Sequence, residues 1–461
     1  MSAPTSTAPT STAPPATGAP ELDSLLEIAR TVVAIAAELG AEEALAGVGR
    51  SVSTELTRRD GRIEKAEESR SLGLSASLMV DGRYSAHATS DLRPEALREF
   101  LTRAVQATRY LEPDADRRLP DRALMGDADI AALDTWDAGH AAQDGDARRT
   151  LVQSLEEATR AQAADLAVRS VSSFAWSGRS ERASVASNGW ESAWRSTSFG
   201  SGVTLSLEDA GGRLPEAWFM TSARHRADVV GVDTVAEQAV LHGRHRLGSG
   251  PAPSGRYPML VENKLVGRVL GVLLGPMQGE ALYEKRSCLE GRLGQRIANA
   301  RLTLIDDPLI PRAAGSSPHD GDGLPSRRRV LVQDGVLQEF LIDVYNGRRL
   351  GQAPTGGDTG NLLVAPGASS PERLLAGLPR AIRVEGFLGG NTNPTSGDFS
   401  FGVHGVLLQG GVAVQHVSEM NISGNLFELL ERYADAADDV WTWSAWRTPS
   451  LLFDDIQFSG S

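Results

Sequence analysis

The sequence predicts an α+β protein of two domains, in which an N-terminal domain of helices and antiparallel sheet precedes a C-terminal β-rich domain. Three observations predict this class. Predicted helices and hairpins come in blocks and do not alternate strictly. Asp-Gly pairs separate extended runs at Asp60-Gly61 and Asp81-Gly82, and this dipeptide is the strongest short-range hairpin signal. The chain also has 48 glycines in 461 residues, which favours many turns and hence much β-structure.

The N-terminal domain is predicted to cover residues 21–250. Residues 21–40 carry apolar side chains at helical spacing, and Gly40 supplies the stop signal. Further helices are predicted over the ranges 94–111, 147–167 and 233–247. Between them, extended runs rich in Ser and Val surround an Asn188-Gly189 turn, so this domain should hold several hairpins.

The first 20 residues, MSAPTSTAPTSTAPPATGAP, are predicted to be a disordered tail. Pro, Ser, Thr and Ala at this density cannot bury enough surface to order themselves. The segment has neither the basic start nor the apolar core of a secretory signal. Nowhere does an apolar run approach the roughly 20 residues that a membrane-spanning helix needs. We therefore expect a cytoplasmic protein.

The C-terminal domain is predicted to cover residues 251–461, after a linker at 251–258, PAPSGRYP. Most of this half consists of short apolar runs between turn residues, including a hairpin about Asp334-Gly335. The predicted helices are few: an apolar one at 264–275 and a second at 425–439.

Charge and cysteine content exclude several functions. The net charge of −13 argues against direct binding of nucleic acid or of an anionic membrane, because both need a basic surface. Cys288 is the single cysteine, so the chain can form no intrachain disulfide and no four-cysteine zinc site. A plain thiol is the favoured interpretation of Cys288, although Lys285 and Arg286 beside it could lower its pKa.

A search for catalytic motifs finds none. The chain has 8 histidines, and no two of them have the helical spacing with an adjacent Glu that a zinc peptidase uses. His242 and His245 are three residues apart without a neighbouring Glu, which favours a solvated helix end. The pair Asp320 and Asp322 is interpreted as a surface turn, because further calcium ligands are missing at the required spacing. Hydrolase, phosphate-loop and dinucleotide fingerprints are also absent.

Two polar clusters near the C-terminus are the candidate site. They lie in the segments GGNTNPTSGDFSF and EMNISGN and comprise Asn391, Thr392, Asn393, Ser396, Asp398, Asn421, Ser423 and Asn425. The alternative is purely structural, since Asn and Ser cap helices and Asp and Asn in glycine-rich turns bond to their own backbone. Trp441, Trp443 and Trp446 form a third cluster, which fits an interface or a core equally well.

The run GGNTNPTSGDFSFGVHGVLLQGGVAVQHVSEMNISGNLFELL and the closing RTPSLLFDDIQFSG resemble the C-terminal signature of the TldD/PmbA family. The similarity extends over most of residues 21–461. The resemblance implies a two-domain architecture and a heterodimeric metallopeptidase. In the TldD branch, a His-Glu-x-x-x-His helix and a cysteine near the C-terminus bind zinc. Here the corresponding stretch 261–294 contains no His, and the segment around Trp441 and Trp446 contains no Cys.

This departure places the chain in the PmbA/TldE branch and implies no catalytic residue and no metal of its own. The resemblance implies a TldD-like partner that carries the zinc, and a substrate that is an unfolded or precursor peptide. The polar clusters would then line a cleft for the peptide or the partner. One alternative is a stand-alone homodimeric binding or regulatory protein, since the family has been described as modulating DNA gyrase. Another is an independent enzyme that uses Cys288 or the His242/His245 pair.

Overall fold

The computed structural model describes residues 20–142 and 144–460. The tail predicted over residues 1–20 therefore lies outside the described residues, apart from Pro20, at which α1 begins. Within the described residues, no helix is both long and apolar enough to cross a membrane. The predicted α+β class is confirmed.

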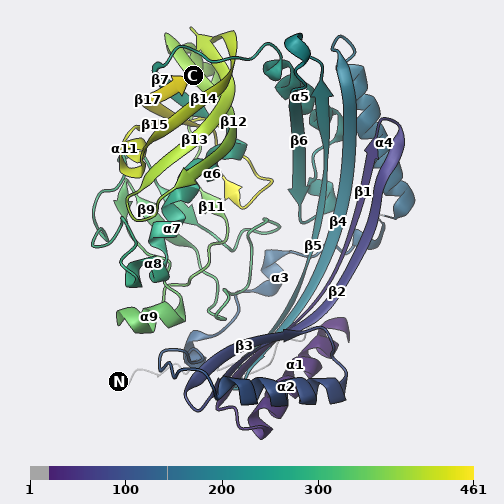
Figure 1. The fold of residues 1–461 in the computed structure, drawn as a ribbon, viewed down its shortest axis with the longest axis vertical. Helices are drawn as coiled ribbons and strands as arrows, with labels where there is room; N and C mark the ends of the chain where they lie inside the picture. The colour runs from purple at the N-terminus through teal and green to yellow at the C-terminus, as the bar shows by residue number, and fades with distance from the viewer. Residues whose placement is uncertain (1–19, 143, 461) are drawn as a thin grey trace, which may run out of the picture.

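One long antiparallel sheet dominates the N-terminal half (Figure 1). Its strand order is β3-β2-β1-β4-β5-β6, and its strands are β1 Glu43–Arg59, β2 Arg62–Val80, β3 Arg83–Thr89, β4 Val168–Ala186, β5 Glu191–Leu207 and β6 Glu216–Ala223. The Asp60-Gly61 and Asp81-Gly82 turns are confirmed, and all four residues have positive φ. That conformation gives the two-residue turn whose twist matches the flanking strands.

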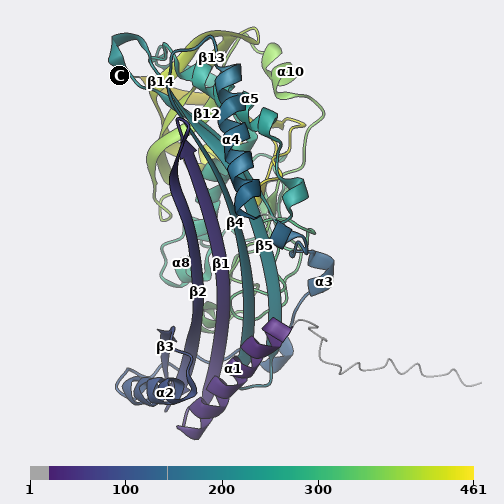
Figure 2. The same ribbon diagram turned by 90° about the vertical axis from the view of Figure 1, so that its right-hand side faces the viewer.

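Helices cover the side of this sheet that faces away from the C-terminal domain (Figures 1 and 2). Buried side chains of α1, Pro20–Glu38, and α2, Pro94–Thr108, pack on one end of the sheet. At the other end, α4, Gly145–Gln162, packs beside α5, Val232–Arg246. Helix α5 also contacts strands of the C-terminal half, so it connects the two parts of the chain.

The C-terminal half is built on a second sheet that closes on itself. Its order is β14-β13-β12-β7-β17-β15, and an additional β14–β17 pairing completes a barrel-like ring. The strands are β7 Gly255–Val261, β12 Arg380–Thr392, β13 Asp398–Gln409, β14 Val412–Asn425, β15 Tyr433–Ala436 and β17 Leu451–Gly460. The largest core cluster of the described residues fills this half.

A small sheet and short helices flank the ring. The sheet comprises β8 Leu304–Asp306, β9 Arg329–Gln333, β10 Val336–Leu337, β11 Leu362–Leu363 and β16 Trp446–Arg447, and β9 and β10 confirm the Asp334-Gly335 hairpin. The helices are α6 Val266–Leu270, α7 Leu274–Met277, α8 Gly279–Tyr283, α9 Val344–Leu350, α10 Pro371–Ala376 and α11 Leu426–Glu431; α3, Ile130–Leu133, lies in the N-terminal half.

Three sequence-based expectations need correction. The helix predicted over 425–439 ends at Glu431, because Tyr433 is buried and pairs with Phe453 of β17. The helix predicted over 264–275 is broken into α6, a short 3-10 turn and α7. The linker predicted over 251–258 is shorter, since β7 already begins at Gly255.

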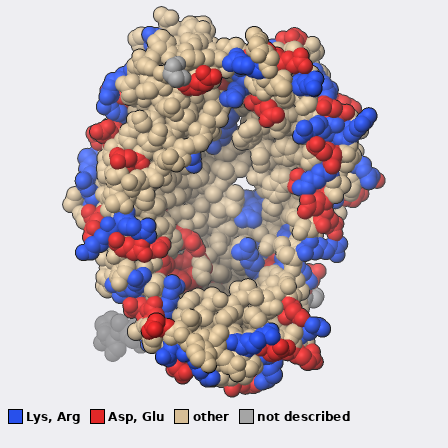
Figure 3. All heavy atoms as spheres, in the orientation of Figure 1, with Lys and Arg blue, Asp and Glu red and all other residues tan. Residues whose placement is uncertain are grey.

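The two halves meet in several zones and leave a hollow between them (Figure 3). In one zone, Arg348 of α9 donates hydrogen bonds to the carbonyls of Asp116, Arg118 and Leu119. In another zone, the indole N–H of Trp443 donates to the Asp228 carbonyl at 3.0 Å. The domain boundary itself stays a prediction.

Candidate functional site

All eight predicted polar residues come together at one end of strands β12, β13 and β14. Asp398 lies opposite Asn425, while Ser400 lies between Asn391 and Ser423 across the three strands. Asn421 lies opposite Gly402, two residues further along β13. We call this set of eight residues the polar strand end.

Four of the eight residues of the polar strand end make hydrogen bonds that hold the loop between β12 and β13 in place. The Asn393 side-chain oxygen accepts from the Thr395 backbone N–H at 2.9 Å, and the Ser396 hydroxyl donates to an oxygen of Asp398 at 2.6 Å. Asn425 donates to the other Asp398 oxygen at 3.0 Å and also caps α11 by accepting from the Phe427 N–H. These bonds match the structural alternative for Asn393, Ser396, Asp398 and Asn425.

The electrostatics of Asp398 do not suit a general base. Hydrogen bonds from Ser396 and Asn425 lower the pKa of its carboxyl group, so the group is a stable carboxylate at neutral pH with both oxygens occupied. Asn391, Thr392, Asn421 and Ser423 are exposed. The arrangement therefore offers surface hydrogen-bonding groups, while it offers no proton-transfer centre.

The segment 261–294, which the family resemblance matches to the zinc-binding stretch of the catalytic branch, contains no His, although it holds Cys288 and four Glu residues. Its α6 helix is covered by the indole of Trp446, and a Cβ at Gly267 would come within 2.6 Å of that ring. Among the described residues, no three His, Cys, Asp or Glu side chains are grouped so that they could hold a metal ion. Zinc needs several such donors around one point, and the Cys and Glu side chains of this segment are not grouped in that way.

Gly267 is expected to be required for this packing. Gly267→Ala should lower the free energy of unfolding by about 1–3 kcal/mol, because the indole of Trp446 must move. Gly271→Ala is the matched control: its Cβ would lie 3.7 Å from the same ring, so it should be neutral or stabilising by up to about 1 kcal/mol. Urea unfolding of both variants checks this, and equal stability of the two would contradict the close packing.

The remaining tryptophans of this cluster pack within the chain. Trp441 makes edge-on contacts with Phe219 and Trp443, at ring-centre distances of 5.9 and 5.0 Å. Because Phe219 belongs to β6, these rings join the two halves of one chain. The same zone encloses a cavity of about 340 Å³ lined by both halves.

His242 and His245 lie in this zone between the halves, so the expectation of a solvated helix end is wrong. His242 accepts from the Lys264 ammonium group at 2.9 Å, and burial lowers the pKa of His242 to about 4. His245 lies 2.8 Å from Glu385 of β12. Because each ring has its own partner on the C-terminal half, the pair does not converge on one ligand.

A third buried histidine lies on β13. Burial lowers the pKa of His404 to about 4, and the nearby Arg246 guanidinium adds to the effect. Its ring occupies the space above Gly386, where a Cβ would approach the ring to 2.0 Å. Nothing in the sequence pattern marks this cluster, because helix α5 and the β12–β13 hairpin that assemble it are far apart in the chain.

Cys288 is a half-buried thiol. Burial raises its pKa, and this outweighs the lowering effect of the Arg292 guanidinium. A raised thiol pKa favours the protonated form, which is not nucleophilic. The interpretation as a plain thiol is therefore supported.

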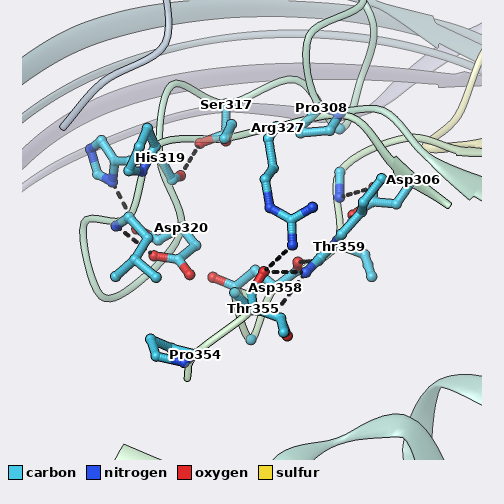
Figure 4. A pocket seen from close by; sticks show the side chains of 18 of the residues that line it. Asp306, Pro308, Ser317, His319, Asp320, Arg327, Pro354, Thr355, Asp358 and Thr359 are labelled. Carbon is cyan, nitrogen blue, oxygen red and sulfur yellow. Dashed lines mark hydrogen bonds and ion pairs between the residues drawn. The ribbon is translucent and has the colours of Figure 1, made fainter. Parts of the chain in front are cut away.

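A pocket of about 540 Å³ in the C-terminal half contains several carboxylates (Figure 4). Asp306 pairs with the buried Arg329 at 2.9 Å. In Figure 4, Asp320 points toward the segment that carries Asp358. The neighbouring Asp322 accepts from the Val344 N–H at 2.8 Å, and burial raises its pKa to about 6. The turn expected at Asp320 and Asp322 is present, whereas both carboxylates are half-buried and not at the open surface.

A long curved antiparallel sheet joined to a closed β-ring defines the fold class of this chain. Residues 254–460 match the model of the PmbA/TldA metallopeptidase C-terminal domain, and residues 46–108 match domain 1 of the same metallopeptidases. The chain belongs to the PmbA/TldD family.

Individual relatives agree with this assignment. The chain is 24% identical to the metalloprotease PmbA of Escherichia coli O157:H7, over 95% of this chain and 98% of that protein. A crystal structure from Bacteroides thetaiotaomicron, described as a candidate modulator of DNA gyrase, is 31% identical with a TM-score of 0.91, covering 94% of this chain and 98% of that one. TldE from Thermococcus kodakarensis, at 19% identity, shares the fold with a TM-score of 0.83 over 94% and 100% of the two chains.

Proposed function

We propose that this chain is the non-catalytic, TldE-like subunit of a two-chain cytoplasmic zinc metallopeptidase of the TldD/TldE type. The observation that carries the proposal is the close packing of the Trp446 indole against Gly267 of α6. Helix α6 lies in the segment where the catalytic branch would hold its metal. Indole and glycine supply no ligand for zinc. The partner subunit, of TldD type, then supplies both the zinc and the activated water.

The substrate in this proposal is an unfolded or precursor peptide. The exposed amides and hydroxyls of Asn391, Thr392, Asn421 and Ser423 can bond to the backbone of an extended chain or to the partner. An enclosed space between two subunits would admit extended chains and exclude folded proteins. The hollow on one face of this chain supports such an arrangement (Figure 3).

Two variants test the role of the polar strand end, and the first leaves the hydrogen bonds of its loop intact. Asn391→Ala combined with Asn421→Ala removes two exposed amides, and it should lower assembly with the TldD-type subunit or peptide turnover by the pair roughly three- to thirtyfold. Asn393→Ala, which also breaks the loop bond to Thr395, should lower them at least as far. Assembly is measured by co-purification and turnover with an unstructured fluorogenic peptide.

Wild-type assembly and turnover in the Asn391/Asn421 variant would remove these residues from the proposed site. Circular dichroism of each variant serves as the folding control. Failure of the wild-type chain to associate with any TldD-type subunit would instead favour the stand-alone homodimeric binding protein.

A further inference from the structure

Among the residues that the structure describes, one long edge of the N-terminal sheet has no strand paired to it. Strand β2 pairs with β1 along its whole length, whereas β3 covers only residues Leu74–Val80 on its other side. Residues 62–72 of β2 are all exposed. Figure 2 shows β2 as the outermost strand, with β3 beside its lower part alone. A free edge presents backbone donors and acceptors that can pair with another chain.

The register shows which backbone groups face outward. The Glu42 N–H donates to the Met79 carbonyl, so Met79 faces β1. The β1–β2 register continues without a shift from Glu43↔Met79 to Thr57↔Lys65. Because successive residues alternate between the two sides of a strand, the odd-numbered residues of this stretch face β1. The N–H and C=O groups of Ala66, Glu68, Arg70 and Leu72 therefore point to the free side.

A shallow hollow of about 720 Å³ adjoins this edge at the end of β3. Its lining is made mainly of small residues from neighbouring strands: Gly47, Gly49, Ser51, Ser71, Gly73 and Ser180. A strand added beside β2 would continue the line of β3, so it would lie next to Ser71, Leu72 and Gly73 at the rim of this hollow. The small residues at the rim leave room for the neighbouring side chains of the added strand.

The charges along the edge do not select one partner sequence. The stretch from Arg62 to Arg70 has three basic and three acidic residues. Several of these are paired inside the sheet: Lys65 lies 2.9 Å from both Glu55 and Glu67, and Arg70 lies 2.7 Å from Glu68. What the edge offers is therefore mainly backbone hydrogen bonding, which is independent of sequence.

We infer that the free edge of β2 over residues 66–72 binds an extended, unfolded peptide segment as an additional antiparallel or parallel strand. This inference rests on the proposed function, in which the chain helps a partner to cleave unfolded peptides, and it gives the N-terminal sheet a role as a holding surface for the substrate. Its determinant is the row of outward-facing amides at Ala66, Glu68, Arg70 and Leu72.

The test removes one outward donor while the β1–β2 ladder stays intact. Arg70→Pro deletes an N–H that no β1 residue accepts, and proline is tolerated at such positions of edge strands. Arg70→Ala is the matched control, because it removes the same charge and keeps the N–H. The probe is a fluorescein-labelled twelve-residue peptide of Ala, Ser, Thr and Val, with binding measured by fluorescence anisotropy.

Arg70→Pro should weaken binding at least about fivefold, since a peptide carbonyl loses its donor, while Arg70→Ala should stay within about twofold of the wild type. The same peptide with every amide N-methylated should not bind the wild-type chain. Circular dichroism and the thermal midpoint show whether Arg70→Pro folds. If it does not, the methylated peptide alone tests whether backbone hydrogen bonds to the edge hold the peptide.

Equal binding by the proline and alanine variants, or undiminished binding of the methylated peptide, would overturn the inference. So would a wild-type dimer that Arg70→Pro converts to monomer without affecting peptide binding, because the edge would then belong to a second copy of the chain. If the chain binds the peptide through this edge but never supports turnover with a TldD-type subunit, the proposed function fails while the edge assignment stands.

Discussion

Acidification from pH 7 to pH 4 is expected to weaken the zone between the two halves of the chain strongly. Burial lowers the pKa values of His242 and His404 from 6.5 to about 4, with further lowering from the nearby Lys264 for His242 and Arg246 for His404. The unfolded chain therefore takes up protons near pH 6.5, whereas the folded chain takes them up only near pH 4. Stability falls as the pH drops between these values, by about 3 kcal/mol for each histidine.

His242→Gln should reduce this acid lability. The glutamine oxygen can still accept from Lys264, but the side chain cannot take up a proton. Urea unfolding between pH 7.5 and pH 4 should show a smaller loss of stability than in the wild type, by about 3 kcal/mol at the acidic end. His404→Gln should reduce the loss by a similar amount. A pH profile unchanged in both variants would show that these rings are not held neutral in the fold.

Asp322→Asn is expected to stabilise the protein at neutral pH by about 2–3 kcal/mol. Burial raises the pKa of Asp322 from 3.8 to about 6, and the nearby Asp320, Asp343 and Asp358 raise it further. Its folded-state pKa thus lies above the unfolded value, so ionisation opposes folding. The cost appears as the pH rises from about 4 to about 6 and is full at pH 7. Asparagine keeps an oxygen that can accept from the Val344 N–H.

The gain should largely disappear below about pH 4, where the aspartate is neutral in the folded chain and mostly neutral in the unfolded chain. Asp398→Asn is the control of opposite sign: hydrogen bonds from Ser396 and Asn425 lower the pKa of Asp398, so removal of its charge should lower stability at neutral pH. Urea unfolding at pH 7 and pH 3.5 measures both variants. A loss of stability in Asp322→Asn at pH 7 would contradict the claim that the ionised carboxylate of Asp322 opposes folding.

Short sequence motifs predicted the structural features that are set by residues next to each other in the chain, such as tight turns. The Asp-Gly turns at Asp60-Gly61 and Asp81-Gly82 were predictable because that dipeptide by itself favours the tight turn. The helix predicted over 425–439 failed at Tyr433, where pairing with a distant strand outweighs local helical preference. The polar strand end was predictable as a cluster, since its residues lie in two stretches that form neighbouring strands.

The histidine and aspartate clusters depend on tertiary contacts and were not predictable. His242 and His404 are 162 residues apart and are buried only because α5 packs against the β-ring. Asp320 and Asp322 lie in a Gly-rich stretch that has the composition of an exposed turn, yet both are half-buried and Asp322 accepts a hydrogen bond from α9. The free edge of β2 was also not predictable from the sequence. Only the strand pairing in the structure shows that β3 ends before it reaches residues 62–72 of β2.

Hydrolysis of an unstructured fluorogenic peptide, measured for this chain alone and after co-purification with a TldD-type subunit, tests the central claim most directly. The account predicts no cleavage by the chain alone, cleavage by the pair, and loss of that cleavage when a chelator removes the partner's zinc. Cleavage by this chain alone would contradict it, because α6 under Trp446 and the polar strand end supply neither a metal site nor a general base.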